Sequence, residues 1–256
     1  MLFGICNLSI VPVRLEPNEN YGMISQVLFG EHFKVLERRK EWSKIRMDFD
    51  KLEGWIDNKQ YLEIDEDYYI KLTETPRCFA GEYIDFITDK DESLATVPLG
   101  ACLPFYSKGK FEILDSKYTY DGATYNAVFK KETLIKIAFM FLNAPFLKGG
   151  KTPFGIDSGG FTQTVYKLCG HQIFRTAPEQ AKQGEVLSFI EESEPGDLAL
   201  FDDAEGNIVH VGLIMFDNYI IHSFGKVRID RLDHSGIFNE ETGRHTHKLR
   251  VIKKII

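Results

Sequence analysis

Three residues in the second half of the chain could together carry out covalent hydrolysis. Ser158 follows a glycine-rich loop and precedes an apolar run, so we expect it at the N-terminus of a helix. Backbone N–H groups and the helix dipole favour negative charge there, which helps to activate a nucleophile. His210 and His222 each lie in a segment with the pattern of a β-strand. A nucleophile, a base and a group that orients the base are the parts of a catalytic triad.

The elements that must position these residues lie between residues 131 and 256. A helical pattern begins after Lys131 and stops at Pro145, and a second helix is expected over residues 161–168. A polar helical stretch follows. The later strands are expected at 197–201, 208–216, 219–224 and 249–256. Helices followed by an antiparallel sheet predict an α+β domain.

The first half of the chain has the pattern of short strands separated by turns. In residues 1–65, alternating segments predict a small β-barrel that is similar to a bacterial SH3-like domain. Residues 66–128 repeat this pattern, with a strand expected over 99–106, and predict a second, more diverged SH3-like barrel. The acidic segment 63–67 is interpreted as a solvated linker between the two.

Composition and charge exclude several classes of partner. The 256 residues carry a net charge of −7, which argues against nucleic acid or an anionic membrane surface. No apolar run approaches the roughly 18 residues of a membrane-spanning helix. The first residues have no basic region, so we expect no signal peptide and a cytoplasmic location. A signal peptide that had already been removed would instead place the protein in the periplasm.

Cysteine and histidine spacing gives no metal motif. Cys6, Cys78, Cys102 and Cys169 are scattered and are interpreted as buried or free thiols in a reducing compartment. The alternating segment 245–247 would put two histidine rings on one face of a strand, and we interpret both as surface residues. We therefore expect no metal and no cofactor.

The order of short motifs in residues 131–256 resembles the NlpC/P60 family of papain-like cysteine peptidases, which act on bacterial cell-wall peptides. The motifs are Phe154–Gln163, Pro195–Leu198, His210–Gly212 and Ile221–His222. The resemblance implies an NlpC-type papain-like domain over residues 129–256, behind SH3-like domains over 1–65 and 66–128. The most similar subgroup is the dipeptidyl-peptidase VI type, whose members cleave the γ-D-glutamyl–L-diamino acid bond of muropeptides.

This resemblance also implies roles for individual residues. The family's nucleophilic cysteine falls on Ser158, its base on His210 and its third, ring-orienting residue on His222. Asp157 falls on the residue that helps to hold the substrate's amine. Several other ligand-facing positions depart from the family pattern or flank such a departure: Lys148, Gly159, Arg175, Thr176, Gly22 and Leu52.

These departures leave three hypotheses about function. The first is a catalytically silent or strongly impaired relative, because a hydroxyl has no accessible anion and must lose its proton during attack. The second is an active muropeptide peptidase seen with its cysteine replaced by Ser158. The third is a serine hydrolase, although the sequence around Ser158 lacks the Gly-x-Ser-x-Gly elbow. The expected ligand is a cell-wall peptide or a related small peptide, and a protein partner is a further possibility.

Overall fold

A computed structural model describes residues 2–256, and the chain forms two compact units. Unit 1 comprises residues 1–127 and 148–152, and unit 2 comprises residues 128–147 and 153–256. Among the described residues, no helix has the length and apolar character needed to span a membrane. The two units are described separately below.

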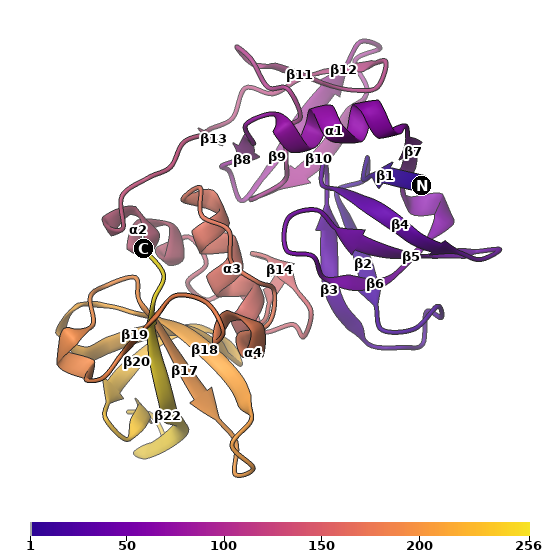
Figure 1. Ribbon diagram of the computed structural model, residues 1–256. Helices are drawn as coiled ribbons and strands as arrows, with labels where there is room; N and C mark the ends of the chain where they lie inside the picture. Colours follow the sequence, from indigo (N-terminus) through magenta and orange to yellow (C-terminus); the bar gives the residue numbers. More distant parts are fainter. Residues whose placement is uncertain (1) are drawn as a thin grey trace. The chain divides into compact units, whose positions relative to one another are not determined.

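Unit 1 begins with a seven-stranded antiparallel sheet in the order β3-β2-β6-β5-β4-β1-β7 (Figure 1). Alternating apolar residues on these strands form a buried cluster that includes Val13, Phe33, Ile45 and Ile56. The strands are β1 (Leu2–Ile5), β2 (Ile10–Arg14), β3 (Met23–Leu28), β4 (His32–Arg38), β5 (Trp42–Met47), β6 (Glu53–Asp57) and β7 (Leu62–Ile64), with a short 3-10 turn at Asn58–Gln60.

The second part of unit 1 shares a core with the first. A buried cluster combines Phe3 of the first sheet and Phe29, which directly follows β3, with Ile87 and Phe111 from the second sheet. The second sheet has the order β10-β9-β12-β11, and a separate pair joins β13 to β8. Its elements are helix α1 (Glu66–Glu74) and strands β8 (Phe79–Ala80), β9 (Ile84–Asp89), β10 (Leu94–Pro98), β11 (Lys110–Ile113), β12 (Ser116–Thr119) and β13 (Thr124–Tyr125). The division of this region into two SH3-like domains stays a prediction.

Two expectations for this region are wrong. The acidic segment 63–67 is no linker, because its second half is the first turn of α1, where the Asp65 side chain accepts a hydrogen bond from Tyr68 N. Acidic residues stabilise that end of a helix. Residues 99–106 form no regular strand: Gly100 adopts a φ of +85° and Phe105 a φ of +56°, which breaks extended pairing.

Unit 2 contains an antiparallel sheet in the order β16-β22-β17-β18-β19-β20-β21. Because β21 also pairs with β22, six of these strands close into a barrel, drawn in orange and yellow in Figure 1. The strands are β16 (Glu185–Leu187), β17 (Leu198–Asp202), β18 (Ile208–Ile214), β19 (Tyr219–Phe224), β20 (Lys226–Asp233), β21 (Gly236–Asn239) and β22 (Arg244–Lys254), with 3-10 turns at Ile190–Glu192 and Phe216–Asn218.

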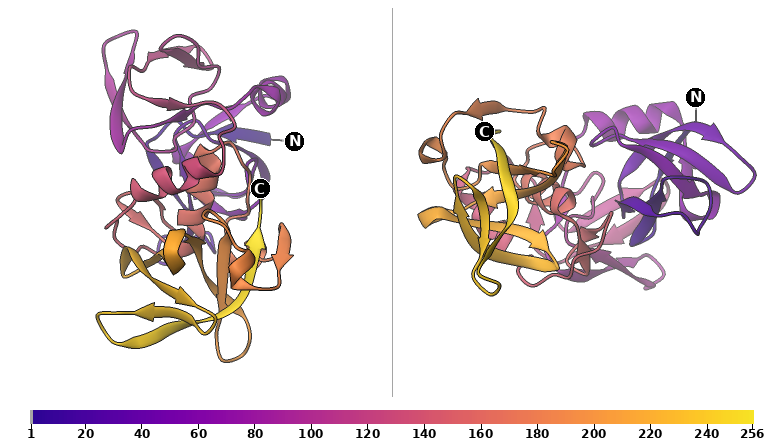
Figure 2. Two further views of the ribbon diagram at one scale, coloured as in Figure 1. Left: turned by 90° about the vertical axis from the view of Figure 1, so that its left-hand side faces the viewer. Right: turned by 90° about the horizontal axis from the view of Figure 1, so that it is seen from below.

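The helices of unit 2 precede most of its strands in the chain, as expected for an α+β domain. Helix α3 packs against α2 and against strands β18 and β19 (Figure 2). Every residue of α3 is buried, including its polar residues, so it is a core helix rather than an amphipathic surface helix. The remaining elements of unit 2 are α2 (Glu132–Phe139), α3 (Ser158–Leu168), α4 (Ala177–Gln180) and the two-residue strand β15 (Gly155–Ile156), whereas β14 (Lys151–Thr152) belongs to unit 1.

Candidate active site

Ser158 is the first residue of α3, at the helix mouth predicted from the sequence. Asp157 precedes it with extended backbone angles, and its Oδ1 accepts a hydrogen bond from Gly160 N at 2.7 Å. This contact satisfies one of the N–H groups that a helix N-terminus leaves without an intrahelical partner. Ser158 is 8% exposed, so its hydroxyl lies in a largely desolvated position.

Arg175 clamps Asp157. Its guanidinium Nη1 and Nη2 donate to the two carboxylate oxygens of Asp157, at 2.8 and 2.9 Å. Arg175 is only 2% exposed, and parallel N–H···O bonds of this kind are strong and geometrically specific. Both oxygens of the predicted amine-binding residue are therefore engaged by a fixed cation.

Gly159 and Thr176 lie beside this pair. A Cβ atom on Gly159 would lie 2.6 Å from the Arg175 carbonyl oxygen, so no side chain fits there without a backbone shift. Thr176 is the N-cap residue of α4, and its hydroxyl donates to Glu179 Oε2 at 2.7 Å. The predicted ligand-facing residues of unit 2 thus gather at the start of α3, where Arg175 holds the carboxylate of Asp157.

The two predicted catalytic histidines form a chain of hydrogen bonds that ends on a carboxylate. His210 Nε2 lies 2.8 Å from His222 Nδ1, and His222 Nε2 lies 3.0 Å from Asp230 Oδ2. Arg228 in turn donates to both oxygens of Asp230, at 2.7 and 3.0 Å. A carboxylate at the end of the chain fixes the tautomer of His222 with its proton on Nε2, which leaves Nδ1 as the acceptor for His210.

Strand pairing explains why the two rings meet. His222 on β19 is directly opposite Gly212 on β18, and His210 is two residues before Gly212 on the same face of that strand. A Cβ on Gly212 would lie 2.9 Å from His222 Cβ. The glycine therefore leaves the space through which the ring of His222 reaches His210.

Burial keeps these imidazoles neutral. It lowers the pKa of His210 well below the ordinary value, and the nearby His222 and His247 lower it further. Burial also lowers the pKa of His222, although the hydrogen bond to Asp230 opposes this. Burial alone would raise the pKa of Asp230, but the contacts with His222 and Arg228 hold it below its usual range. The site therefore contains neutral histidines on an ionised carboxylate.

Ser158 is not coupled to this chain of bonds in the structure. Among residues 2–256, no hydrogen bond joins the Ser158 hydroxyl to His210. The helix that carries Ser158 nevertheless packs on the strands that carry both histidines. The arrangement thus has an aligned base and orienter, but the hydroxyl is not hydrogen-bonded to the base as in an activated serine.

His247 corrects the sequence interpretation that residues 245 and 247 are both surface residues on one face. The pairing of β21 with β22 shifts register around Thr246, which breaks the alternation. His245 lies at the surface and contacts Asp233 at 2.9 Å. His247 is half-buried, and its ring stacks on His210 with centroids 4.1 Å apart and planes 25° apart.

The other predicted ligand residues belong to unit 1. Gly22 is exposed, with no atom within 4 Å of an added Cβ among the described residues. Lys148 is also exposed, and its neighbour Gly149 lies against the backbone of Met23, so Lys148 and Gly22 belong to adjoining segments. Leu52 is half-buried and packs on the apolar cluster of the first sheet. Their roles in ligand binding stay predictions.

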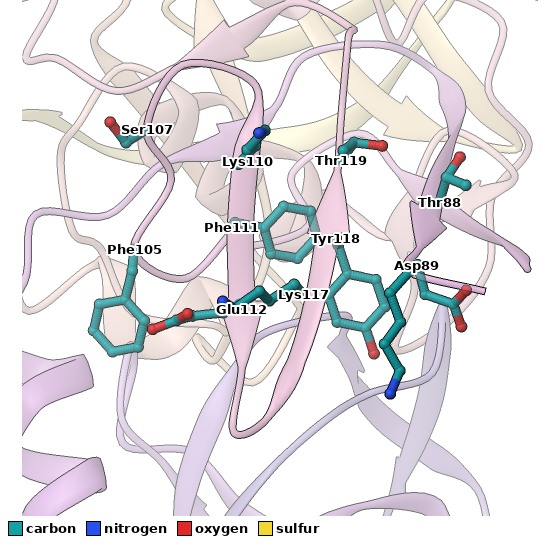
Figure 3. A pocket seen from close by; sticks show the side chains of 11 residues that line it. Thr88, Asp89, Phe105, Ser107, Lys110, Phe111, Glu112, Lys117, Tyr118 and Thr119 are labelled. Carbon is teal, nitrogen blue, oxygen red and sulfur yellow. The ribbon is translucent and has the colours of Figure 1, made fainter. Parts of the chain in front are cut away.

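A cavity of about 490 Å³ lies on the second sheet of unit 1 (Figure 3). The rings of Phe111 and Tyr118 stack with centroids 5.1 Å apart, and the side chains of Lys110, Lys117 and Asp89 also line the cavity. None of the residues singled out from the sequence lies in it.

Sequence reasoning missed Asp230, Arg228 and His247. The tight turn at Gly225 could have signalled the first two, because it sets the register of β20 against β19 and places Arg228 opposite His222. No local signal could have placed His247 on His210, because that contact depends on the bulge in β22 and on closure of the barrel.

Comparison with known proteins agrees with this architecture. Residues 143–245 match the NlpC/P60 family, and residues 13–60 match the bacterial dipeptidyl-peptidase SH3 domain. The chain is 28% identical over 225 residues to a γ-D-glutamyl-L-lysine dipeptidyl-peptidase of Bacillus cereus, covering 78% of this chain and 66% of the relative. A protein of the same name from Bacillus subtilis is 36% identical over 94 residues, covering 36% of this chain and 31% of the relative. The chain thus spans less than two thirds of either relative.

Solved structures show the same fold over nearly the whole chain. An NlpC/P60 family protein from Bacillus cereus superposes with a TM-score of 0.82 at 18% identity, covering 99% of both chains. An NlpC/P60 endopeptidase from Photobacterium damselae superposes with a TM-score of 0.74 at 14% identity, covering 97% of this chain and 70% of that one. By the two family matches, the chain contains an NlpC/P60 domain over residues 143–245, preceded by a bacterial dipeptidyl-peptidase SH3 domain over residues 13–60.

Proposed function

We propose that this protein binds cell-wall peptides containing a γ-D-glutamyl–L-diamino acid bond, on a peptidase scaffold whose hydrolytic activity is lost or strongly reduced. The observation that carries the proposal is Ser158 itself, at the capped mouth of α3, without a hydrogen bond to His210 among the described residues. The ligand class comes from the names of the relatives, which are γ-D-glutamyl-L-lysine dipeptidyl-peptidases.

The electrostatics of the base support impaired hydrolysis. A cysteine peptidase works from a thiolate beside an imidazolium, and the thiolate's charge stabilises the protonated ring. With Ser158 no such anion forms, and burial holds His210 neutral with a pKa well below its ordinary value. A base with so low a pKa removes a hydroxyl proton poorly at neutral pH.

One observation favours the alternative of an active peptidase in which serine stands in for cysteine. The series of hydrogen bonds from His210 through His222 to Asp230 is complete, and Arg228 holds the carboxylate in place. These contacts orient His210 as a base, so their presence favours a site in which His210 still acts as one. The two readings differ in what Ser158→Cys should do.

A turnover assay with two peptides separates them. The protein and its Ser158→Cys variant are incubated with L-Ala-γ-D-Glu-L-Lys and with L-Ala-γ-D-Glu-diaminopimelate, and released L-Ala-D-Glu is measured. We expect both forms to bind peptide in calorimetry, and we expect the unmodified protein to be slower than an intact peptidase by several orders of magnitude. Strong cleavage by Ser158→Cys alone supports the alternative, whereas no cleavage by either form supports a silent relative.

Two controls define the outcome. Ser158→Cys combined with His222→Ala should lose any activity gained, because the base then lacks its orienting group. Strong cleavage by the unmodified protein, at a rate comparable to that of Ser158→Cys, would contradict impaired hydrolysis. Failure of both forms to bind either peptide would overturn the proposed ligand.

A further inference from the structure

His247 has no place in the proposed peptide chemistry, yet it lies against the two histidines that do. Its ring stacks on His210 at 4.1 Å and meets His222 at 5.8 Å and an interplanar angle of 82°. One nitrogen from each of the three rings lies within 4.8 Å of the others. The three residues come from β18, β19 and β22, so barrel closure assembles the cluster.

We propose that His210, His222 and His247 form a binding site for a divalent transition-metal ion that prefers imidazole nitrogen, such as Zn²⁺. Bonds of about 2.0–2.1 Å in tetrahedral geometry separate ligand nitrogens by about 3.3 Å. To reach that spacing, His210 Nε2 and His222 Nδ1, now 2.8 Å apart, must separate slightly. The nitrogen of His247 must approach the other two by up to about 1.5 Å. Side-chain rotations of one or two rings supply a movement of that size.

The contacts around each ring leave suitable donor atoms. His222 Nε2 is held by Asp230 at 3.0 Å, so its Nδ1 carries a lone pair that faces the cluster. A carboxylate behind a ligating histidine is the arrangement that orients the ring and raises its basicity at metal sites. Nδ1 of His247 contacts the Thr246 hydroxyl at 2.9 Å, which leaves Nε2 for the ion.

His210 needs one rearrangement. Its Nε2 donates to His222 in the structure, so ion binding between the two rings replaces that hydrogen bond and moves the proton of His210 to Nδ1. No proton is gained or lost overall, because both tautomers are neutral. Three histidine ligands leave a fourth position for water or a small anion, as in zinc sites with an open position.

A charged pair and two aromatic rings surround the cluster. Asp230 is 4% exposed and ionised, and Arg228 contacts both of its oxygens. Phe201 and Phe224 are the aromatic neighbours of the His247 ring, with centroids at 5.9 and 4.8 Å, and they bring no charge. The proposal does not depend on peptide binding, because none of these residues needs a peptide to be in place.

Calorimetry with Zn²⁺ tests the site on the full chain at pH 7, after dialysis against a chelator. We expect one ion per chain, and His247→Phe should weaken binding at least tenfold while keeping the stacked ring. His245→Phe is the matched control, since this residue is two positions away on the same strand but contacts Asp233 at the surface. It should bind Zn²⁺ within about twofold of the unmodified protein.

Two further measurements keep the test decisive. Asp230→Asn should weaken binding about 10- to 100-fold if the carboxylate supports the ligand behind it. The Asp230→Asn variant also tests the site if circular dichroism shows that His247→Phe is misfolded. Co²⁺ titration should give the visible absorption of a tetrahedral site, and this absorption should disappear in His247→Phe. Equal Zn²⁺ binding by His247→Phe and the unmodified protein, or no binding at one equivalent, overturns the proposal.

Discussion

Acid should destabilise unit 2 through the histidine cluster, and His247 sets the measurable window. Burial and the nearby His222 lower the pKa of His247 to about 4, from about 6.5 in an unfolded chain. Between these values the unfolded state binds more protons than the native state, so stability falls as pH falls from about 6.5 to about 4. Below pH 4 the effect is complete. Ionised Asp230 contributes stability in a different pH range. Because its pKa is lowered, this contribution is lost only when the pH falls below about 4.

The shift sets the size of the effect. At about 1.4 kcal/mol per pKa unit, a change from 6.5 to about 4 corresponds to about 3.5 kcal/mol. His247 is only half-buried, so solvent screening reduces this to about 2 kcal/mol. The pKa values of His210 and His222 are shifted in the same direction and add to the loss with the same sign.

Urea unfolding followed by circular dichroism at pH 7 and pH 4.5 measures this loss. His247→Phe cannot be protonated and keeps an aromatic ring against His210. On acidification to pH 4.5, where most of the effect has developed, it should therefore lose about 1.5 kcal/mol less than the unmodified protein. The two tryptophans, Trp42 and Trp55, lie in unit 1, so their fluorescence reports that unit separately. An equal acid-induced loss in His247→Phe, or an imidazole pKa near 6.5 for His247 by NMR, would refute the reasoning.

Three further predictions concern the framework of the site. Gly159→Ala should destabilise the protein by about 1–3 kcal/mol in urea unfolding despite alanine's better helix propensity, because the new Cβ meets a backbone oxygen at 2.6 Å; Gly22→Ala, which meets nothing in the described chain, is the control. Lys131→Met should cost about 3 kcal/mol by the same measurement, because it removes the cation 2.6 Å from the fully buried Asp197; Asp197→Asn together with Lys131→Met should recover part of that. Arg175→Lys should weaken peptide binding in calorimetry, since an ammonium cannot make the two-pronged contact with Asp157.

The local elements of the site could be predicted from the sequence alone. A glycine-rich loop followed by an apolar run predicted a helix start at Ser158, and the structure begins α3 there, with Asp157 as a cap that was not predicted. Alternation predicted the strands that carry His210 and His222, and both form. These features depend on neighbouring residues only, because capping and strand alternation are local properties of the chain. The helical nature of 66–74 was missed because acidic residues are common both in linkers and in first helical turns.

Tertiary structure decided what surrounds the two histidines. Asp230 reaches His222 only through the pairing of β19 with β20, and Gly212 matters only because the same ring lies opposite it. His247 lies far along the chain and reaches His210 because a bulge in β22 changes its face and the barrel closes. Such contacts join strands that are distant in sequence, so no periodicity in the sequence records them. The start of α3 could thus be predicted from the sequence, whereas the three-histidine cluster forms only when the barrel closes.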